Sequence, residues 1–527
     1  MQNLTRAHRV TVFVALLFVT ATANRAFAQR STNFATPTLP PDHWAVVAAR
    51  RAALLGFAPI EMGFGDGTLT QAAVGRMLYA STEQSVASSA ARSLVAADWQ
   101  RFAREFPGVA ARISGMPTRE PLGPPGIPPV TWATSLDTRI VGASGRLLPV
   151  RSLDRTRENV APPTPINNLG DADLEVRLGG TIGNYFAAEL ASGRGDGSWL
   201  LHDWQLAGGV RSLGAWVGKR APDYGPAVGG GVIFDGRAAF SGGGVMLTNG
   251  VQLPWFLQKL GVWRGESFLA RIDSSAGTRH PWLFASHVSL TPHRRLTLGA
   301  TQAFMFSGQG LPPFTFRNFK EMFLTHGIKT AGREFENGIA SVEAQWRVPV
   351  PHVPTNLYVE WGSDDNHSAW FKFPAVVAGV SVPSLPGAPS VSLGLERASF
   401  AAPCSDCNGC ACEYYATWYR HYVFMDGWTL DRRPIGHPLG GDGTEWLAYG
   451  RFDNSARRLR LETRAFARNR GRYNLFSPTR EGRSVGGRIA ADYRLTNTFE
   501  LRADAELEHG RRDWNASSFS AGLRWVP

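Results

Sequence analysis

The stretch RLRLETRAFAR at residues 458–468 decides the fold, because its side chains alternate between apolar and charged along the chain. Only Phe466 breaks the alternation. The same pattern recurs in residues 488–495, 499–508 and 518–526. Successive side chains of a β-strand point to opposite faces of its sheet, so a period of two is the pattern of a strand. The end of the chain therefore predicts consecutive β-strands.

A soluble β-sandwich would also alternate, so length and charge must decide which solvent the apolar face meets. These segments run to about ten residues, the length that a tilted strand needs to cross a bilayer. Their charged face belongs in water, whereas the apolar face ends in aromatic residues such as Tyr493 and Trp525. Aromatic girdles of this kind border the lipid-facing band of membrane barrels. The pattern favours a transmembrane β-barrel over a soluble β-protein.

The alternation continues upstream, for example in residues 341–348 and 357–361. About four hundred residues, at roughly twenty for each strand and its turn, allow about 16 to 18 strands. We therefore predict a mainly β fold in which residues 131–527 form a large antiparallel outer-membrane β-barrel. The Gly-rich stretch 228–250 lacks the Lys of a phosphate-binding loop, and we expect it to pack its backbone closely inside the barrel.

Residues 1–28 have the features of a cleaved signal peptide. Arginines precede an apolar stretch at 10–21, and Ala26-Phe27-Ala28 has the form of a signal-peptidase site. No later run of eighteen apolar residues predicts a transmembrane helix. Export, no helical span and a lipid-compatible strand pattern together indicate the bacterial outer membrane.

Residues 29–115 predict a small periplasmic helical region, and the Pro- and Gly-rich residues 116–130 predict a linker. Asp42 and Thr70 are the expected N-caps of the first two helices. The helices are expected at residues 43–55, 71–79 and 94–106. Short helices in water depend on packing, so we expect a bundle that buries its apolar faces on itself or on the barrel mouth.

The formal net charge of +12 comes almost wholly from arginine, since only five of the 55 basic residues are lysine. Guanidinium groups make forked hydrogen bonds to carboxylates and phosphates. In an outer membrane the natural partners are acidic polysaccharides and lipopolysaccharide, and nucleic acid is not expected there. The alternative is that many arginines simply line the lumen opposite Asp and Glu.

All four cysteines lie in one short cluster, spaced C-x2-C-x2-C-x-C: Cys404, Cys407, Cys410 and Cys412. This spacing is cramped for a tetrahedral metal site and lacks a second arm. An oxidising compartment favours two disulfides that staple a loop, with three possible pairings left open. We predict neither a metal nor a cofactor.

No catalytic motif is evident in the sequence, which has neither a G-x-S-x-G elbow nor an H-E-x-x-H helix. We predict no catalytic residues and no enzymatic activity. Residues 419–442 instead mix aromatic side chains with Arg, His and Asp, a combination that stacks on sugar rings and bonds their hydroxyls and carboxylates. The candidate polysaccharide-binding residues are Tyr419, Arg420, His421, Trp428, His437 and Asp442.

Several short segments carry a family resemblance: Tyr419-Arg420-His421, Asp426-Gly427-Trp428, Pro434-Ile435-Gly436-His437, Gly441-Asp442, Met305-Phe306-Ser307-Gly308 before Phe316-Arg317-Asn318-Phe319, and Leu357-Tyr358-Val359-Glu360 before Asp364-Asp365. With these segments, the chain resembles the Wzi family of outer-membrane capsule-assembly proteins over nearly its whole mature length. The resemblance implies an eighteen-stranded barrel with an N-terminal periplasmic helical bundle. It also implies a lectin-like, non-enzymatic role in holding capsular or related exopolysaccharide at the cell surface. The cysteine cluster departs from the family's pattern.

We therefore predict an outer-membrane barrel, more simply a monomer, that binds an acidic surface polysaccharide through outward loops. Two other functions stay open. A barrel of this size also permits a porin-like channel for sugars or other anionic solutes, which conductance would detect. An outer-membrane hydrolase would need a Ser, a His and an acid to converge on one rim.

Overall fold

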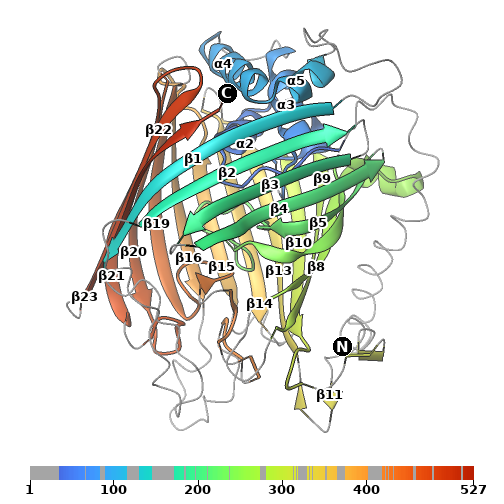
Figure 1. The fold of residues 1–527 in the computed structure, drawn as a ribbon. Helices are drawn as coiled ribbons and strands as arrows, with labels where there is room; N and C mark the ends of the chain where they lie inside the picture. The colour runs from blue at the N-terminus through green and yellow to red at the C-terminus, as the bar shows by residue number, and fades with distance from the viewer. Residues whose placement is uncertain are drawn as a thin grey trace.

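The computed structural model in Figure 1 describes residues 35–526 apart from a set of internal gaps. The gaps are residues 66, 84–88, 115–129, 145–170, 183–185, 196–197, 211, 237, 273–279, 312–313, 316, 319–328, 331–332, 335, 351–352, 365–373, 401–417, 422, 425, 431–432, 455–457, 478–479 and 512–513. The predicted signal peptide and the four cysteines lie outside the described residues. Among the helices described, none is long and apolar enough to cross a membrane.

A single antiparallel sheet of nineteen strands closes on itself, because β1 pairs with both β2 and the last strand, β23. The strand β7 continues β6 against the same partner, β8, so the wall has eighteen positions, nineteen less one. The prediction of a large antiparallel barrel of 16–18 strands is confirmed.

The bounds of the sheet strands are β1 Val130–Ser144, β2 Asp171–Ile182, β3 Phe186–Gly195, β4 Ser198–Val210, β5 Leu213–Arg220, β6 Phe240–Leu247, β7 Val251–Gln252, β8 Val262–Arg271, β9 Trp282–His293, β10 Leu296–Phe306, β13 Glu336–Val348, β14 Thr355–Asp364, β15 Ala375–Val382, β16 Val391–Phe400, β19 Gly443–Asn454, β20 Leu459–Arg470, β21 Gly482–Arg494, β22 Phe499–Gly510 and β23 Trp514–Trp525. Two small hairpins pair β11 Lys329–Thr330 with β12 Arg333–Glu334, and β17 Thr429–Leu430 with β18 Arg433–Pro434.

The stretch 458–468 alternates in the structure as its sequence predicts. In β20, Thr463, Ala465 and Ala467 are exposed on the outer face, and the residues between them point into the lumen. Phe466 is therefore a lumen residue, which explains why it breaks the pattern. Its ring packs beside Leu447, its partner on β19, and under the Arg468 guanidinium, whose Cζ lies 3.8 Å from the ring centroid.

The lumen face of the last strands is laced with ion pairs between arginines and acids. Arg470 pairs with Glu508 at 2.6 Å, and Arg451 pairs with Glu462 at 2.8 Å. Charged groups that are screened from water need such partners. Many of the arginines that make the chain basic are therefore part of the wall.

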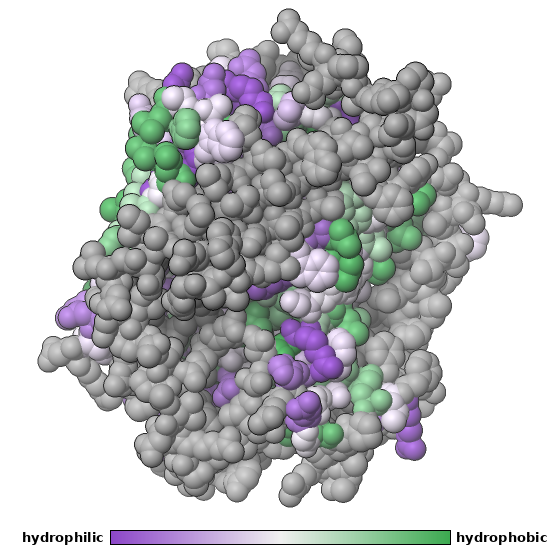
Figure 2. All heavy atoms as spheres, viewed as in Figure 1, coloured by the Kyte–Doolittle hydropathy of each residue, from purple (hydrophilic) through white to green (hydrophobic). Residues whose placement is uncertain are grey.

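The outer face carries exposed apolar side chains, including Ile489, Leu507 and Trp446. Figure 2 shows hydrophobic residues gathered along the upper left edge, over the β21–β23 side of the barrel, with hydrophilic residues over the helices above. Apolar atoms outside and charges inside invert the arrangement of a soluble protein. Lipid is the solvent that fits this outer face.

In the described part of the chain, four α-helices precede the barrel and pack on one another at the end where the C-terminus also lies (Figure 1). Their bounds are α2 Trp44–Leu54, α3 Gln71–Glu83, α4 Ser89–Glu105 and α5 Pro107–Ser114. Thr70 caps α3 as predicted, since its Oγ1 accepts the Ala73 N–H at 3.1 Å. The prediction of Asp42 as the cap of α2 is wrong. His43 occupies that position, and its Nδ1 accepts the Ala45 N–H at 3.2 Å.

Buried ion pairs hold the helices to the barrel wall. Arg51 of α2 contacts Asp98 of α4 at 2.7 Å and Asp453 of β19 at 3.3 Å. Arg524 of β23 donates to Glu105 of α4 at 2.7 Å. The bundle therefore closes one end of the barrel, here called the helix-bearing end. The opposite end is called the loop end.

Candidate functional site

The described parts of three connections at the loop end fold inward and fill the lumen. They belong to residues 221–239 between β5 and β6, 418–442 between β16 and β19, and 471–481 between β20 and β21. Their apolar side chains form one buried cluster with residues of the wall. Its loop members include Tyr224, Ile233, Phe234, Trp418, Trp428, Leu439 and Phe476. We expected residues 419–442 to project outward, but the described part of this segment packs into the barrel, because its large aromatic side chains find their apolar environment there.

The first two connections are joined by hydrogen bonds from buried aromatic side chains. The Tyr419 hydroxyl donates to the Val232 carbonyl and accepts the His437 N–H at 2.9 Å. The Trp428 indole N–H donates to the Ile233 carbonyl at 3.0 Å. Buried polar atoms of Tyr and Trp need partners, and here each partner lies on a loop backbone. The aromatic side chains therefore fix the path of the loops.

Two wall carboxylates bind the backbone of the connection 221–239, here called the Gly-rich connection. Glu360 accepts the Val232 N–H at 2.9 Å, and Glu396 accepts the N–H groups of Val228 at 2.9 Å and Gly229 at 3.1 Å. A Cβ at position 229 would collide with the Glu396 carboxylate, so glycine is required for this approach. The tight backbone packing inside the barrel that we predicted for residues 228–250 is found at residues 228–232, whereas residues 240–247 form β6 of the wall.

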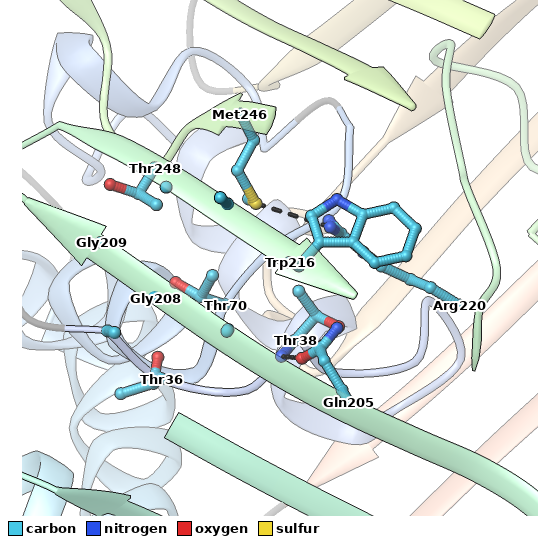
Figure 3. Close-up of a pocket in the computed structure, with 14 residues that line it drawn as sticks. Thr36, Thr38, Thr70, Gln205, Gly208, Gly209, Trp216, Arg220, Met246 and Thr248 are labelled. Atoms are coloured by element: carbon cyan, nitrogen blue, oxygen red, sulfur yellow. Dashed lines mark hydrogen bonds between the residues drawn. The ribbon is translucent and has the colours of Figure 1, made fainter. Parts of the chain in front are cut away.

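The plug formed by these loops reaches the helix-bearing end. Asp223, at the start of the first connection, pairs with Arg50 of α2 at 2.7 Å. Close by, Thr38 and Gln205 exchange hydrogen bonds between the N-terminal segment and β4. Figure 3 shows these two residues beside a cavity of about 20 Å³, which is a size for water and not for a sugar. This cavity is therefore too small to be a polysaccharide site.

Five of the six candidate residues are buried, and four of these lie inside the plug. Tyr419, Trp428 and His437 have no exposed surface, and His421 is 3% exposed. The His421 Nδ1 accepts the Val423 N–H at 3.2 Å, and burial lowers the pKa of His421 to about 3. The ring is therefore neutral near pH 7. In this conformation these four side chains shape the loops and do not present a surface to a polymer.

The other two candidates, Arg420, which is only 8% exposed, and Asp442, which is half-buried, lie at the loop end beside Arg472 and Tyr473, and we call these four residues the Tyr473 patch. The Arg420 Nη1 donates to the Tyr473 carbonyl at 3.4 Å, and Asp442 accepts the Tyr473 N–H at 2.9 Å. Arg472 is exposed, with its Cζ 5.9 Å from the Tyr473 ring centroid, and Tyr473 is half-buried. An aromatic face, two cations and an acid thus meet at one place.

Burial raises the pKa of Asp442 above its ordinary value, whereas the Tyr473 N–H and the charge of Arg420 favour the ionised form. Gly471 allows this contact, because a Cβ there would overlap the Asp442 carboxylate. Buried Asn474 fixes the arrangement from below. Its amide donates to the carbonyls of Leu439, Gly441 and Asp442 at 2.9, 3.0 and 3.0 Å.

Sequence reasoning missed Arg472 and Tyr473. Their signal is an aromatic residue that directly follows two arginines in the sequence RGRYNLF, which begins at the last residue of β20. The alternation of β20 drew attention to the strand and away from the connection that follows it. In the described part of the chain, no group of three or more His, Cys, Asp or Glu side chains could hold a metal ion.

A closed barrel with an apolar exterior, an ion-paired lumen and inward-folded loops defines a plugged β-barrel membrane protein. The family described as capsule assembly protein Wzi matches residues 172–520. Because this match spans well over half of the chain, the protein belongs to the Wzi capsule-assembly family. It is an outer-membrane β-barrel, and the predicted family is confirmed.

Among solved structures, the chain is similar to Wzi of Escherichia coli, described as an outer-membrane protein involved in group 1 capsule assembly and as a carbohydrate-binding β-barrel. The two share 14% identity and a TM-score of 0.66, over 93% of this chain and 99% of that one. Pseudomonas aeruginosa OccK5 (OpdH) matches at 9% identity and a TM-score of 0.43, over 75% of this chain and 97% of its own. P. aeruginosa OprD matches at 6% identity and a TM-score of 0.42, over 76% of this chain and 95% of its own. These likenesses concern the fold alone. No curated protein sequence matches the chain.

Proposed function

We propose that this protein binds an acidic capsular or related polysaccharide and holds it at the cell surface without changing it chemically. The observation that carries the proposal is the Tyr473 patch, which places cations and an aromatic ring at the open end of a plugged barrel. The carbohydrate binding described for the E. coli relative supports the same function.

The proposed orientation places the helices in the periplasm and the loop end outside the cell. Outer-membrane barrels have short periplasmic turns and longer extracellular loops. The turn between β9 and β10 is short and lies at the helix-bearing end, next to the helices. The longest described connections lie at the other end and carry the patch. This orientation supports a periplasmic assignment for the helical region, with residues 1–28 as its export signal.

The patch has the chemistry to hold an acidic sugar. Exposed Arg472 would pair with its carboxylates, Tyr473 would stack on a ring, and Asp442 would accept hydroxyl protons. Buried Arg420 would hold Tyr473 in place through the carbonyl of that residue. Each contact is weak, but contacts repeated along a polymer add through effective concentration. The four candidates inside the plug would contribute by holding the loops in place. The same cations at the loop end would tolerate the phosphates of neighbouring lipopolysaccharide, with the protein acting as a monomer.

The plug argues for binding over transport and hydrolysis. Loops that pack across the lumen leave a sugar-sized solute little room, so a porin-like role is disfavoured. A hydrolase needs a general base that can reach substrate, and both His421 and His437 are enclosed. Membership of the Wzi family supports a lectin-like role without enzymatic activity.

The test is deletion of the gene, followed by separate assays of the polysaccharide retained on cells and of that shed into the medium. We expect deletion to move polymer from the cells to the medium, and the intact gene to reverse this. Tyr473→Ala should restore retention only partly, since a lost stacking contact weakens each binding event by roughly 1 kcal/mol. Unchanged retention in the deletion strain would overturn the proposal.

Tyr493→Ala is the matched control. Tyr493 is a half-exposed tyrosine on β21, at the helix-bearing end and far from the patch, so its loss should leave retention at the level of the intact protein. Immunoblots of isolated outer membranes must show equal amounts of both variants. Equal retention with Tyr473→Ala and Tyr493→Ala would remove the patch from the binding surface.

A further inference from the structure

A short helix outside the barrel wall exposes the two least buried large apolar side chains among the described residues. This helix, η3, spans Trp255–Leu260 between β7 and β8, and none of its residues is buried. Trp255 is 78% exposed and Phe256 69% exposed. In Figure 1 it is the green helix at the right, outside the strands and toward the helix-bearing end. Water is a poor solvent for such a pair.

The backbone of η3 indicates that this exposure is built into the fold. Trp255 has a φ of 62°, which a bulky residue adopts only at an energetic cost of the order of 1 kcal/mol or more. The connection that leads to η3 is fixed, because the Gly250 N–H donates to the Glu61 carbonyl beside the helical bundle at 3.0 Å. The chain is thus held in a strained conformation that turns two aromatic side chains away from the protein.

The strand register places η3 at the border of the lipid-facing surface. The helix ends just before β8, whose Trp263 pairs with Leu290 of β9. Leu290 in turn pairs with Leu298 of β10, a residue that is 39% exposed on the outer face. The exposed aromatic side chains of η3 therefore continue the apolar exterior of the wall at its helix-bearing edge.

We infer that η3 lies in the membrane interface and binds phospholipid of the periplasmic leaflet. Trp and Phe insert at the boundary between headgroups and acyl chains, where an amphipathic ring has both solvents within reach. Lys259, one of only five lysines in the chain, is exposed next to Leu260 and is placed to meet a lipid phosphate. The inference uses the orientation proposed above and is independent of polysaccharide binding.

The test places a photoreactive benzophenone side chain at position 256 of the full chain, which is then irradiated in intact cells. We expect intact-mass analysis of the purified barrel to show a phospholipid adduct. The same group at position 472, on the loop end, should give no phospholipid adduct. A crosslink from position 256 to a second protein chain, or no adduct at all, would overturn the inference.

A second measurement uses tryptophan fluorescence in bilayers of brominated phospholipid. Bromines near the carbonyl end of the acyl chains should quench the fluorescence of Trp255. The Trp255→Phe variant should therefore lose a part of the quenching seen with these lipids. With lipids brominated deep in the acyl chains, the quenching should be the same as in the intact protein. Trp346→Phe serves as the matched control, because Trp346 is 45% exposed on the wall at the same end. If only the wall variant lost quenching, η3 would lie outside the membrane. Polymer retention by Trp255→Phe should stay unchanged, which separates this result from a failure of the proposed function.

Discussion

Replacing Arg51 by methionine should weaken the docking of the helical bundle to the barrel. The Asp98 side chain is 1% exposed and lies 2.7 Å from the Arg51 guanidinium, while Asp453 on β19 lies 3.3 Å away. Arg51→Met keeps the length of the side chain but leaves both carboxylates buried without this partner. Breaking a buried pair in this way costs about 3–5 kcal/mol. The substitution should lower the free energy with which the bundle docks on the barrel, because Arg51 joins two helices to the wall.

Hydrogen exchange followed by mass spectrometry measures this opening in α2 and α4. A loss of about 3 kcal/mol should speed exchange of their slow amides roughly a hundredfold, while the wall strands keep their protection. Arg51→Met/Asp98→Asn should recover part of the loss, because it removes one of the two uncompensated charges. The matched control is Arg104→Met, since exposed Arg104 contacts Asn497 on a wall turn at 3.3 Å and its loss should cost under about 0.5 kcal/mol. Equal exchange in Arg51→Met and Arg104→Met would refute the reasoning.

Three further outcomes are expected. Burial lowers the pKa of His43 from its ordinary value of 6.5 to about 4, although Glu105 acts to raise it. Between these pH values the His43 ring is therefore protonated in the undocked bundle and neutral in the docked one. Docking should therefore weaken by up to about 1.4 kcal/mol per pH unit as the pH falls from about 6.5 to about 4, and a His43→Gln variant should lose this slope when exchange is followed against pH. Asn474→Ala should remove the amide hydrogen bonds to three carbonyls, of which Leu439 keeps the Arg470 guanidinium and Asp442 keeps the Gly471 N–H, at a cost of about 2 kcal/mol. This cost should be seen as faster exchange in residues 437–442 and weaker polymer retention with an unaltered wall. In planar bilayers the intact protein should pass little current and a deletion of residues 224–236 should pass more, whereas a large steady current through the intact protein would show that the loops do not block the lumen.

The barrel could be predicted from sequence because its wall has a simple period. Lipid on one side and water on the other force alternate residues of β20 to differ, so the pattern is visible without any neighbour. The pattern alone does not explain why position 466, on the lumen face, is apolar. The Phe466 ring packs there beside Leu447, a residue on another strand. The prediction of the α2 cap was wrong for a similar reason. Asp42 is the better cap by residue type, but His43 sits where Glu105 and Arg524 hold its ring.

The site was harder to predict because loops have no period. Aromatic and charged side chains in residues 419–442 fit a sugar surface and a packed plug equally well, and composition does not distinguish the two. Tyr419 and Trp428 turn inward because the Gly-rich connection supplies backbone carbonyls to their polar atoms. That partner lies almost two hundred positions earlier in the sequence. Arg420 and Asp442 were in the predicted set, which stays a prediction. Tyr473 was not in that set, because its place beside them depends on the pairing of β19 with β20, which brings the two connections together.

The pairing of β1 with β23 has a consequence for the order of assembly. The cylinder cannot seal until the final strand is synthesised, and Arg524 on that strand also binds Glu105, 419 positions away. Contacts between such distant parts of a chain form late, because a long loop must be closed first. Closure of the barrel and docking of the helical bundle thus both depend on the same last segment. A nascent chain cut short before β23 would leave both unfinished, so quality-control proteases would meet a loose bundle and an open edge together.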